Sequence, residues 1–222
     1  MSKIIYLLIS VCISGFALEI KQLPIEFGDK RIELTKQYIK SHYNLDVKDI
    51  KIIPRIVVIH HTAIDDFKDS LSRFTSETLP TDRPDIQSAG AVNVSTHFMI
   101  ERNGTINQLM PLDYMGRHVI GLNYNSIGIE NVGGENPAQR DNLTDAQLRS
   151  NIELVKMLKK RFQTIEYVIG HYEYRCFEKT SLWLELDDNY RTKKDDPSIR
   201  FMKELRSNIQ GFKKAPCKGI ND

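Results

Sequence analysis

The sequence has little net charge, no internal repeat and no low-complexity tract. Its 31 Lys and Arg residues nearly balance its 29 Asp and Glu residues, and the charges are spread along the chain, so composition gives no electrostatic case for nucleic-acid binding. At 222 residues the chain is too short for a large modular architecture. A hydrophobic share of 41% and a charged share of 27% are ordinary for a globular protein, which excludes disordered and fibrous folds.

A hydrophobic run long enough to span a bilayer is also missing. The apolar run Ile4–Ile13 is well under the ~20 residues that a membrane-spanning helix needs. Lys3 precedes this run and small residues, including Ala17, follow it, which is the pattern of a secretory signal peptide over residues 1–17. A short buried strand or helix, or an uncleaved anchor, is the alternative. We predict export to the periplasm or the extracellular space, with no stable membrane insertion after cleavage.

Cysteine is scarce, with three residues in the chain. Cleavage after Ala17 removes Cys12 and leaves Cys176 and Cys217. Two cysteines in an oxidising compartment can form a disulfide. Two unpaired thiols remain the alternative, because the sequence does not give the distance between them.

Strand patterns alternate with helix patterns along the remaining chain. We expect a charged lead-in at 18–50 with a helix at 30–41, a main domain at 51–212 and a tail at 213–222. Strands are expected at 56–61, 94–101, 105–110, 126–132 and 167–171, and helices at 65–78, from 144 for about five turns, and from 197 to 209. Residues 81–90 read as a surface loop. The fold class is α/β, a single domain with a mixed central β-sheet flanked by helices.

Two local signals support this assignment. Asn103-Gly104 separates two apolar segments and predicts a hairpin. Thr144 and Gln147 form a capping box ahead of the longest predicted helix.

Histidines gather at the ends of the predicted strands, where α/β folds place their sites. Imidazole is the commonest metal ligand, and catalytic zinc takes three protein ligands and leaves a position for water. Asp195 or Asp196, after Lys194, offers a carboxylate as the third ligand. Hydrogen-bonded structural histidines and a solvated acidic turn are the alternatives. The histidines concerned are His60, His61, His97, His118 and His171.

Six segments occur in one order from about Ile56 to about Arg206: VVIHHTA, VSTHFMIERNGTINQL, RHVIG, NSIGIENVG, GHYEYR and KKDDP. Together they resemble the zinc-dependent N-acetylmuramoyl-L-alanine amidase family, the amidase relatives of the peptidoglycan recognition proteins. The resemblance implies that 51–212 is an amidase-like catalytic domain with one zinc ion per chain at the strand ends. It also implies peptidoglycan or muropeptides as the substrate. No feature predicts an oligomeric state.

The resemblance implies that His60, His171 and Asp196 bind the zinc. Adjacent residues of a strand point to opposite faces, so His60 and His61 cannot both face one metal, and the resemblance selects His60. Asp196 fits the family's Lys-x-Asp-Pro frame, with Asp195 as its rival.

The resemblance also implies roles for three further residues. Glu130, a lone acid in an apolar strand, corresponds to the general base, and Lys194 to the cation that stabilises the oxyanion. His118 corresponds to a histidine that lines the substrate groove, although Arg117 replaces the family's Trp in front of it. We expect His97 to be a buried structural histidine.

The sequence departs from the family pattern in two places. About twenty residues, including Trp183, separate His171 from Lys194, where the family often has a short stretch. Trp183 either stacks on a sugar or belongs to a packed loop. Ser198 stands where the family commonly has Gly.

The activity expected from these residues is hydrolysis of the amide bond between N-acetylmuramic acid and L-alanine. The alternatives are a peptidoglycan-binding module without catalysis, a zinc peptidase that cuts within the stem peptide, and a structural envelope protein.

Overall fold

The computed structural model describes residues 18–134 and 142–217, so the predicted signal peptide at 1–17 lies outside the described residues. A six-stranded mixed sheet with the order β1-β4-β3-β5-β2-β6 forms the centre. The strands are β1 (Ile20–Gln22), β2 (Ile56–His61), β3 (Phe98–Ile100), β4 (Ile106–Gln108), β5 (Ser126–Asn131) and β6 (Tyr167–Gly170). The pairing of β3 with β4 is antiparallel, and the other four pairings are parallel. The predicted mixed sheet is confirmed.

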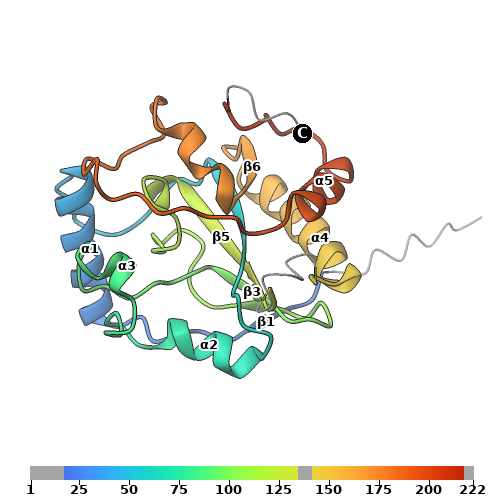
Figure 1. Ribbon diagram of the computed structural model, residues 1–222, viewed down its shortest axis with the longest axis horizontal. Coiled ribbons are helices and arrows are strands. Elements are labelled where there is room, and N and C mark those ends of the chain that lie inside the picture. The colour runs from blue at the N-terminus through green and yellow to red at the C-terminus, as the bar shows by residue number, and fades with distance from the viewer. Residues whose placement is uncertain (1–17, 135–141, 218–222) are drawn as a thin grey trace, which may run out of the picture.

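Helices cover both faces of this sheet (Figure 1). The α-helices are α1 (Asp29–Tyr43), α2 (Phe67–Thr75), α3 (Pro84–Gln87), α4 (Asp145–Arg161) and α5 (Ile199–Ser207), and the 3-10 helices are η1 (Asn123–Asn125) and η3 (His171–Phe177). Figure 1 shows α1 and α3 on one side of the sheet and α4 and α5 on the other. Among the described residues, no helix is both long and apolar enough to cross a bilayer.

The sequence of β2 explains the two-sided core. Ile56 and Val58 pack into one apolar cluster, which also contains residues of α1. Val57 and Ile59 pack into the other cluster, with residues of α4 and α5. Successive side chains of a strand point to opposite faces, so His60 continues the face of Ile56 and Val58. We call this the α1 face of the sheet.

Both local signals are confirmed. β3 and β4 form the hairpin, and Gly104 in its turn has a φ of 90°, which favours glycine. Thr144 accepts a hydrogen bond from the backbone N–H of Gln147, and the Gln147 side chain caps Thr144 in return, so the capping box begins α4.

Several elements differ from the predictions in their bounds; the helix expected at 65–78, for example, spans Phe67–Thr75. β3 begins at Phe98 instead of 94, because the N–H of Ser95 donates to the carbonyl of Arg117, a loop residue, instead of to a strand. A short helix, α3, lies inside the predicted 81–90 loop. The last helix begins at Ile199 instead of 197, because the hydroxyl of Ser198 caps it by accepting from the N–H of Phe201.

The N-terminal segment and the C-terminal segment both attach to the domain. β1 pairs with β4 at the sheet edge, and Tyr38 and Ile39 of α1 are buried in the core. Cys176 of η3 and Cys217 form a disulfide bond, which decides between the two alternatives left open by the sequence.

Candidate metal centre

Three side chains from distant parts of the chain converge on the α1 face of the sheet. His60 ends β2, His171 begins η3 directly after β6, and Asp196 precedes α5. His60 Nδ1 lies 3.0 Å from His171 Nδ1 and 3.4 Å from Asp196 Oδ2. His171 Nδ1 lies 3.1 Å from the same oxygen. All three residues are buried, and together they form a group that can hold a metal ion.

These distances fit the donor set of a tetrahedral zinc site. Zinc with bonds of about 2.0–2.1 Å places neighbouring ligand atoms about 3.3 Å apart. Two imidazole nitrogens and one carboxylate oxygen are ligands that zinc accepts, and three of them leave a fourth position open. The chemistry and the spacing of the group therefore fit zinc.

Neighbouring residues hold two of these side chains in place. The N–H of Tyr172 donates to the backbone carbonyl of Asp196 at 3.1 Å, which joins η3 to the segment before α5. The carboxylate of Glu173 accepts from the N–H of Gly170 at 2.8 Å and pairs with Arg206 of α5. The two elements that carry His171 and Asp196 are thus bonded to each other.

Burial and neighbouring charges set the protonation of the group. Burial, followed by the charge of the nearby His171, lowers the pKa of His60 to about 4, which favours the neutral imidazole that a metal requires. Burial by itself raises the pKa of Asp196, but the adjacent His171 and His60 bring it well below its ordinary value. The carboxylate is therefore ionised.

Glu130 lies beside this group on the neighbouring strand. Its position in β5 is in register with His60 in β2, so both side chains point to the α1 face. The exposed fraction of Glu130 is 8%, and its Oε2 is buried and has no hydrogen-bond partner among the described residues. Burial, followed by the charge of Asp196, raises the pKa of Glu130 to about 8, while Lys194 opposes this rise.

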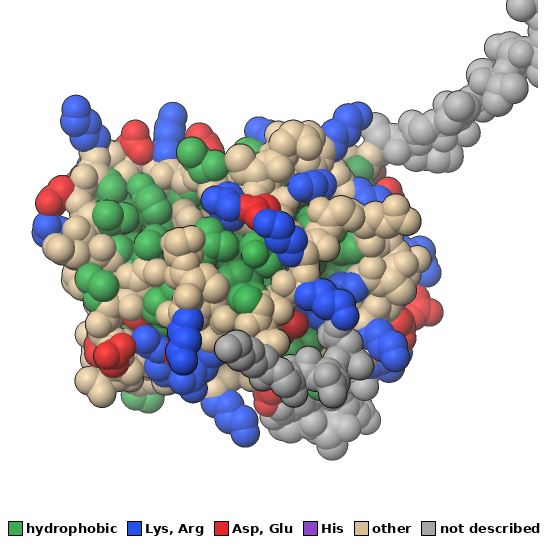
Figure 2. All heavy atoms as spheres, turned by 90° about the horizontal axis from the view of Figure 1, so that it is seen from above, with side chains coloured by type: hydrophobic (Ala, Val, Ile, Leu, Met, Phe, Trp, Pro, Cys, Tyr) green, Lys and Arg blue, Asp and Glu red, His purple; other side chains and the backbone are tan. Residues whose placement is uncertain are grey.

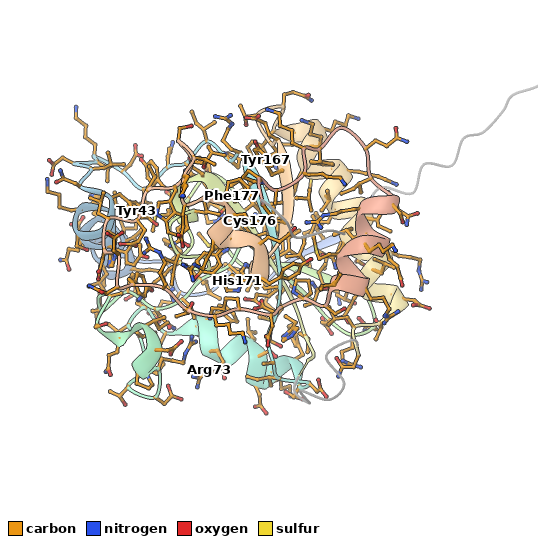
Figure 3. All side chains as sticks on the ribbon, turned by 45° about the horizontal axis from the view of Figure 1, so that its top comes forward. Tyr43, Arg73, Tyr167, His171, Cys176 and Phe177 are labelled. Atoms are coloured by element: carbon orange, nitrogen blue, oxygen red, sulfur yellow. A yellow bond between two sulfur atoms is a disulfide. The ribbon has the colours of Figure 1, made fainter. Side chains whose placement is uncertain are left out.

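A cavity of about 550 Å³ joins these residues. Figure 3 shows His171 near the centre of the molecule and Arg73 on α2, and both residues line this cavity. Its wall also includes Lys194, His118 and Glu130. The structure therefore brings together every residue that the sequence analysis placed in the site.

The other candidate residues lie outside the group formed by His60, His171 and Asp196. His61 and Asp195 also line the cavity but do not belong to the group that could hold a metal ion. His97 is fully buried: its Nε2 contacts the carbonyl of Tyr114 at 2.9 Å, and its Nδ1 accepts from the N–H of Gly128 at 3.1 Å. Both of its ring nitrogens have partners inside the protein, as expected for a structural histidine.

Trp183 is packed within the connection between η3 and Lys194. Its ring stacks on Tyr174 at a centroid distance of 6.0 Å, and Arg191 lies over it at 4.7 Å. A Cβ at Gly121 would come within 2.6 Å of the indole. These contacts favour the packed-loop alternative for Trp183.

Arg73 and Arg83 also line the cavity but were not predicted from the sequence. Arg73 pairs with Asp82 and Arg83 with Asp85, on the surface formed by α2 and the α3 segment. No local motif identifies them, because only the packing of this surface against the strand ends brings them to the cavity.

Positive side chains are scattered over the face that carries η3, as the sequence predicted for the chain as a whole. Figure 2 shows Lys and Arg side chains between hydrophobic ones on this face, with Asp and Glu among them.

Comparison with known proteins agrees with this arrangement. The sequence model of the family described as N-acetylmuramoyl-L-alanine amidase matches residues 50–198. An endolysin of Klebsiella phage KP32 is 34% identical over 88 residues, which make up 38% of this chain and 56% of the endolysin. The chain thus matches little more than half the length of that relative.

The chain is similar to solved structures, of which AmpD shows the same fold. A selenomethionine derivative of AmpD is 20% identical, with a TM-score of 0.53, and the match covers 88% of this chain and 97% of that one. AmiD from E. coli, in complex with the substrate anhydro-N-acetylmuramic acid-L-Ala-D-gamma-Glu-L-Lys, is 24% identical, with a TM-score of 0.49 and coverages of 74% and 62%.

Proposed function

Since the chain belongs to the N-acetylmuramoyl-L-alanine amidase family, we propose that it hydrolyses the amide bond between N-acetylmuramic acid and L-alanine in peptidoglycan or muropeptides. The observation that carries the proposal is the convergence of two histidine nitrogens and one carboxylate oxygen within 3.4 Å of one another. His60, His171 and Asp196 would hold one zinc ion. Zinc in such a site polarises a carbonyl group and makes water acidic enough to ionise near neutral pH.

Glu130 is suited to move the proton in this reaction. No residue of 18–134 or 142–217 donates a hydrogen bond to its Oε2, and its pKa of about 8 lies near neutral pH, where a carboxylate can both accept and return a proton. In the proposed reaction, Glu130 takes the proton of the attacking water and passes it to the leaving amine of L-alanine. Water first adds to the carbonyl carbon and forms the new C–O bond. The C–N bond then breaks, and no covalent enzyme intermediate forms.

Lys194 is the proposed electrostatic partner of the developing oxyanion. It lines the same cavity, and its charge favours a lower pKa at both Glu130 and His60, which supports a position near the candidate metal centre. A fixed ammonium group near the scissile carbonyl stabilises the charge that appears only as water adds to the carbon.

Glu130 also bears on the alternative of a binding module without catalysis, because its buried Oε2 has no hydrogen-bond partner in the part of the chain that the structure describes. A buried carboxylate oxygen in this state costs stability, and a module that only binds peptidoglycan gains nothing from it. A zinc peptidase that cuts within the stem peptide would need the same site, so the products of the reaction separate these two enzymes.

We propose that the protein acts outside the cytoplasm, in the periplasm or the extracellular space. The signal-peptide pattern at 1–17 and the Cys176–Cys217 disulfide support this location, because disulfides persist in oxidising compartments.

The test is product analysis. Purified protein loaded with zinc is incubated with muropeptides, and the products are identified by mass spectrometry. We expect free stem peptides that begin with L-alanine, together with peptide-free muramic sugars. Sugar–peptide linkages that stay intact, or cuts within the stem peptide, would contradict the proposal. Protein treated with a chelator and then given zinc again serves as the control.

A further inference from the structure

His118 makes its polar contacts with the protein. Its Nδ1 lies 3.0 Å from His60 Nε2, and its Nε2 lies 3.2 Å from the hydroxyl of Ser126. The Ser126 hydroxyl in turn donates to the carbonyl of Leu122 at 2.8 Å. The chain of contacts therefore begins at a residue of the metal-binding group and ends at a backbone carbonyl.

The tautomers along this chain follow from the site. His60 directs Nδ1 to His171 and Asp196, so a metal there requires an unprotonated Nδ1. A neutral imidazole then carries its proton on Nε2. That N–H points to His118 Nδ1, which must accept, so the proton of His118 is on its own Nε2 and faces Ser126. In this series of contacts every N–H and O–H has an acceptor. In the other tautomer of His118, its Nδ1–H would point at the Nε2–H of His60.

We propose that His118 is a positioning residue that fixes the tautomer and ring orientation of His60 for zinc. This inference rests on the proposed function. It assigns His118 a role through His60, in place of the direct substrate contact that the family resemblance implies. Groups that accept from the second nitrogen of a metal-binding histidine orient its ring and raise its basicity.

The surroundings of His118 support this role. The N–H groups of His118 and Val119 both donate to Asn123 Oδ1, at 2.8 and 2.7 Å, which fixes the loop that carries the ring. Gly128 lies on the α1 face of β5, where a Cβ would come within 2.8 Å of His118 Nδ1. The absence of a side chain at Gly128 leaves the space in which the ring reaches His60.

The experiment compares two substitutions of different chemistry at the same position. In His118→Asn, Oδ1 takes the place of Nδ1 and can accept from His60. His118→Leu fills similar space without an acceptor. Zinc affinity is measured by competition with a chelator, and the absorption spectrum of the Co²⁺-loaded protein reports ligand geometry without any turnover. Unfolding of the zinc-free variants by denaturant shows whether the fold is intact.

We expect His118→Leu to bind zinc about 10- to 100-fold more weakly than the wild type and to change the Co²⁺ spectrum. His118→Asn is expected to stay within about threefold of the wild type. Equal affinity of the Leu variant and the wild type, or an equal loss in both variants, would overturn the proposal. The proposed function fails separately, in the wild-type protein, by absence of zinc binding or of amide cleavage.

A second measurement does not depend on any substitution. The ¹⁵N chemical shifts of the imidazoles report which ring nitrogen carries the proton. In the zinc-loaded protein we expect the Nε2–H tautomer for both His60 and His118. An Nδ1–H tautomer at His118 would overturn the proposal.

Discussion

Glu130 and Asp196 are both buried carboxylates, yet their surroundings shift their pKa values in opposite directions. Asp196 contacts two histidines, which keep its pKa well below the ordinary value. Glu130 contacts no such partner within the described ranges, and burial, followed by the charge of Asp196, raises its pKa to about 8. Different environments thus suit one carboxylate to hold a cation and the other to exchange protons.

The first prediction concerns Glu130→Gln. The amide keeps the shape of the side chain but cannot accept a proton, so we expect turnover to fall about 10²- to 10⁴-fold. Zinc content, measured by elemental analysis, should not change, because Glu130 is outside the metal-binding group. Glu153→Gln, on the exposed part of α4, is the matched control and should keep full turnover. Full turnover of the Glu130 variant would move the base to another residue.

The second prediction separates the two adjacent aspartates. Asp196→Asn removes the charge of a residue within 3.4 Å of both histidine nitrogens, so zinc affinity should fall by at least about 100-fold. Asp195→Asn makes the same chemical change at an exposed neighbour and should leave zinc affinity within about threefold. Titration with a chelator measures the zinc affinity of both variants. A larger loss in Asp195→Asn than in Asp196→Asn would assign the ligand to Asp195.

For individual residues, the sequence predicted which side chains converge at the candidate metal centre, but not the other hydrogen bonds that these side chains form. The strand alternation and the family motifs brought His60, His171 and Asp196 to one point. The hydrogen bond from His60 to His118 was not predictable, because it depends on how a loop after β4 folds over β5, and no periodicity in the sequence indicates that fold. Ser126 and Gly128, which complete this arrangement, carry no local signal of their own.

Among the secondary-structure elements, η3 and α5 matter most to the site, because His171 and Asp196 lie at their N-terminal ends. Arg206, on the last turns of α5, pairs with the buried Glu173 of η3 and also donates to the carbonyl of Val168 at 3.2 Å. This residue fixes the distance between the two elements and, through them, between two of the three ligand side chains.

The third prediction therefore concerns Arg206→Ala. The change leaves Glu173, 5% exposed, without its cationic partner, and we expect the free energy of unfolding to fall by about 3 kcal/mol. Denaturant titration of the zinc-free protein measures this loss. Arg200→Ala, which breaks a surface ion pair of the same helix, should cost less than about 1 kcal/mol. Equal losses of unfolding free energy in both variants would show that the Glu173–Arg206 pair contributes no more to stability than a surface ion pair.

Elements with a strong local pattern were predicted well, and those defined by tertiary contacts were not. The apolar run of β2, the Asn103-Gly104 hairpin and the Thr144 capping box each follow from neighbouring residues. β3 is shorter than its apolar pattern, because Ser95 bonds to a distant loop. The edge strand β1 had no predicted strand signal, since its three residues are ordered by pairing with β4.

Over the whole molecule, stability depends on the state of the buried histidines. Burial lowers the pKa of His97 to about 4 from an ordinary 6.5. The folded state therefore resists protonation that the unfolded chain accepts. The contribution of His97 to stability is complete above pH 6.5 and is lost as the pH falls from 6.5 towards 4.

The fourth prediction follows from the lowered pKa of His97. Zinc-free wild-type protein should lose stability between pH 6.5 and 4, with His97 alone contributing about 1.4 kcal/mol per pH unit. His97→Gln keeps a donor for the carbonyl of Tyr114 but does not titrate, so the slope should decrease by about that amount. Denaturant titrations at several pH values measure it. An unchanged dependence of stability on pH would show that His97 takes up its proton in the folded protein as readily as in the unfolded chain.

The fifth prediction concerns removal of the metal from the whole protein. A ligand that binds only the folded state stabilises it by about 2.7 kcal/mol at a free concentration of 100 times its Kd. Chelation should therefore lower the unfolding temperature, and added zinc should restore it. In Asp196→Asn this response should shrink. The same response in that variant would place the stabilising zinc elsewhere.

The three side chains of the candidate metal centre come from the end of β2, the start of η3 and the segment before α5, and the Cys176–Cys217 disulfide gives this spacing a consequence for a nicked chain. A cut of the backbone between residues 178 and 195 places Asp196 on a different piece from His60 and His171. Cys176 lies before such a cut and Cys217 after it, so the disulfide still joins the two pieces. A nicked molecule would therefore keep its carboxylate beside the two imidazoles until a reductant opens that bond.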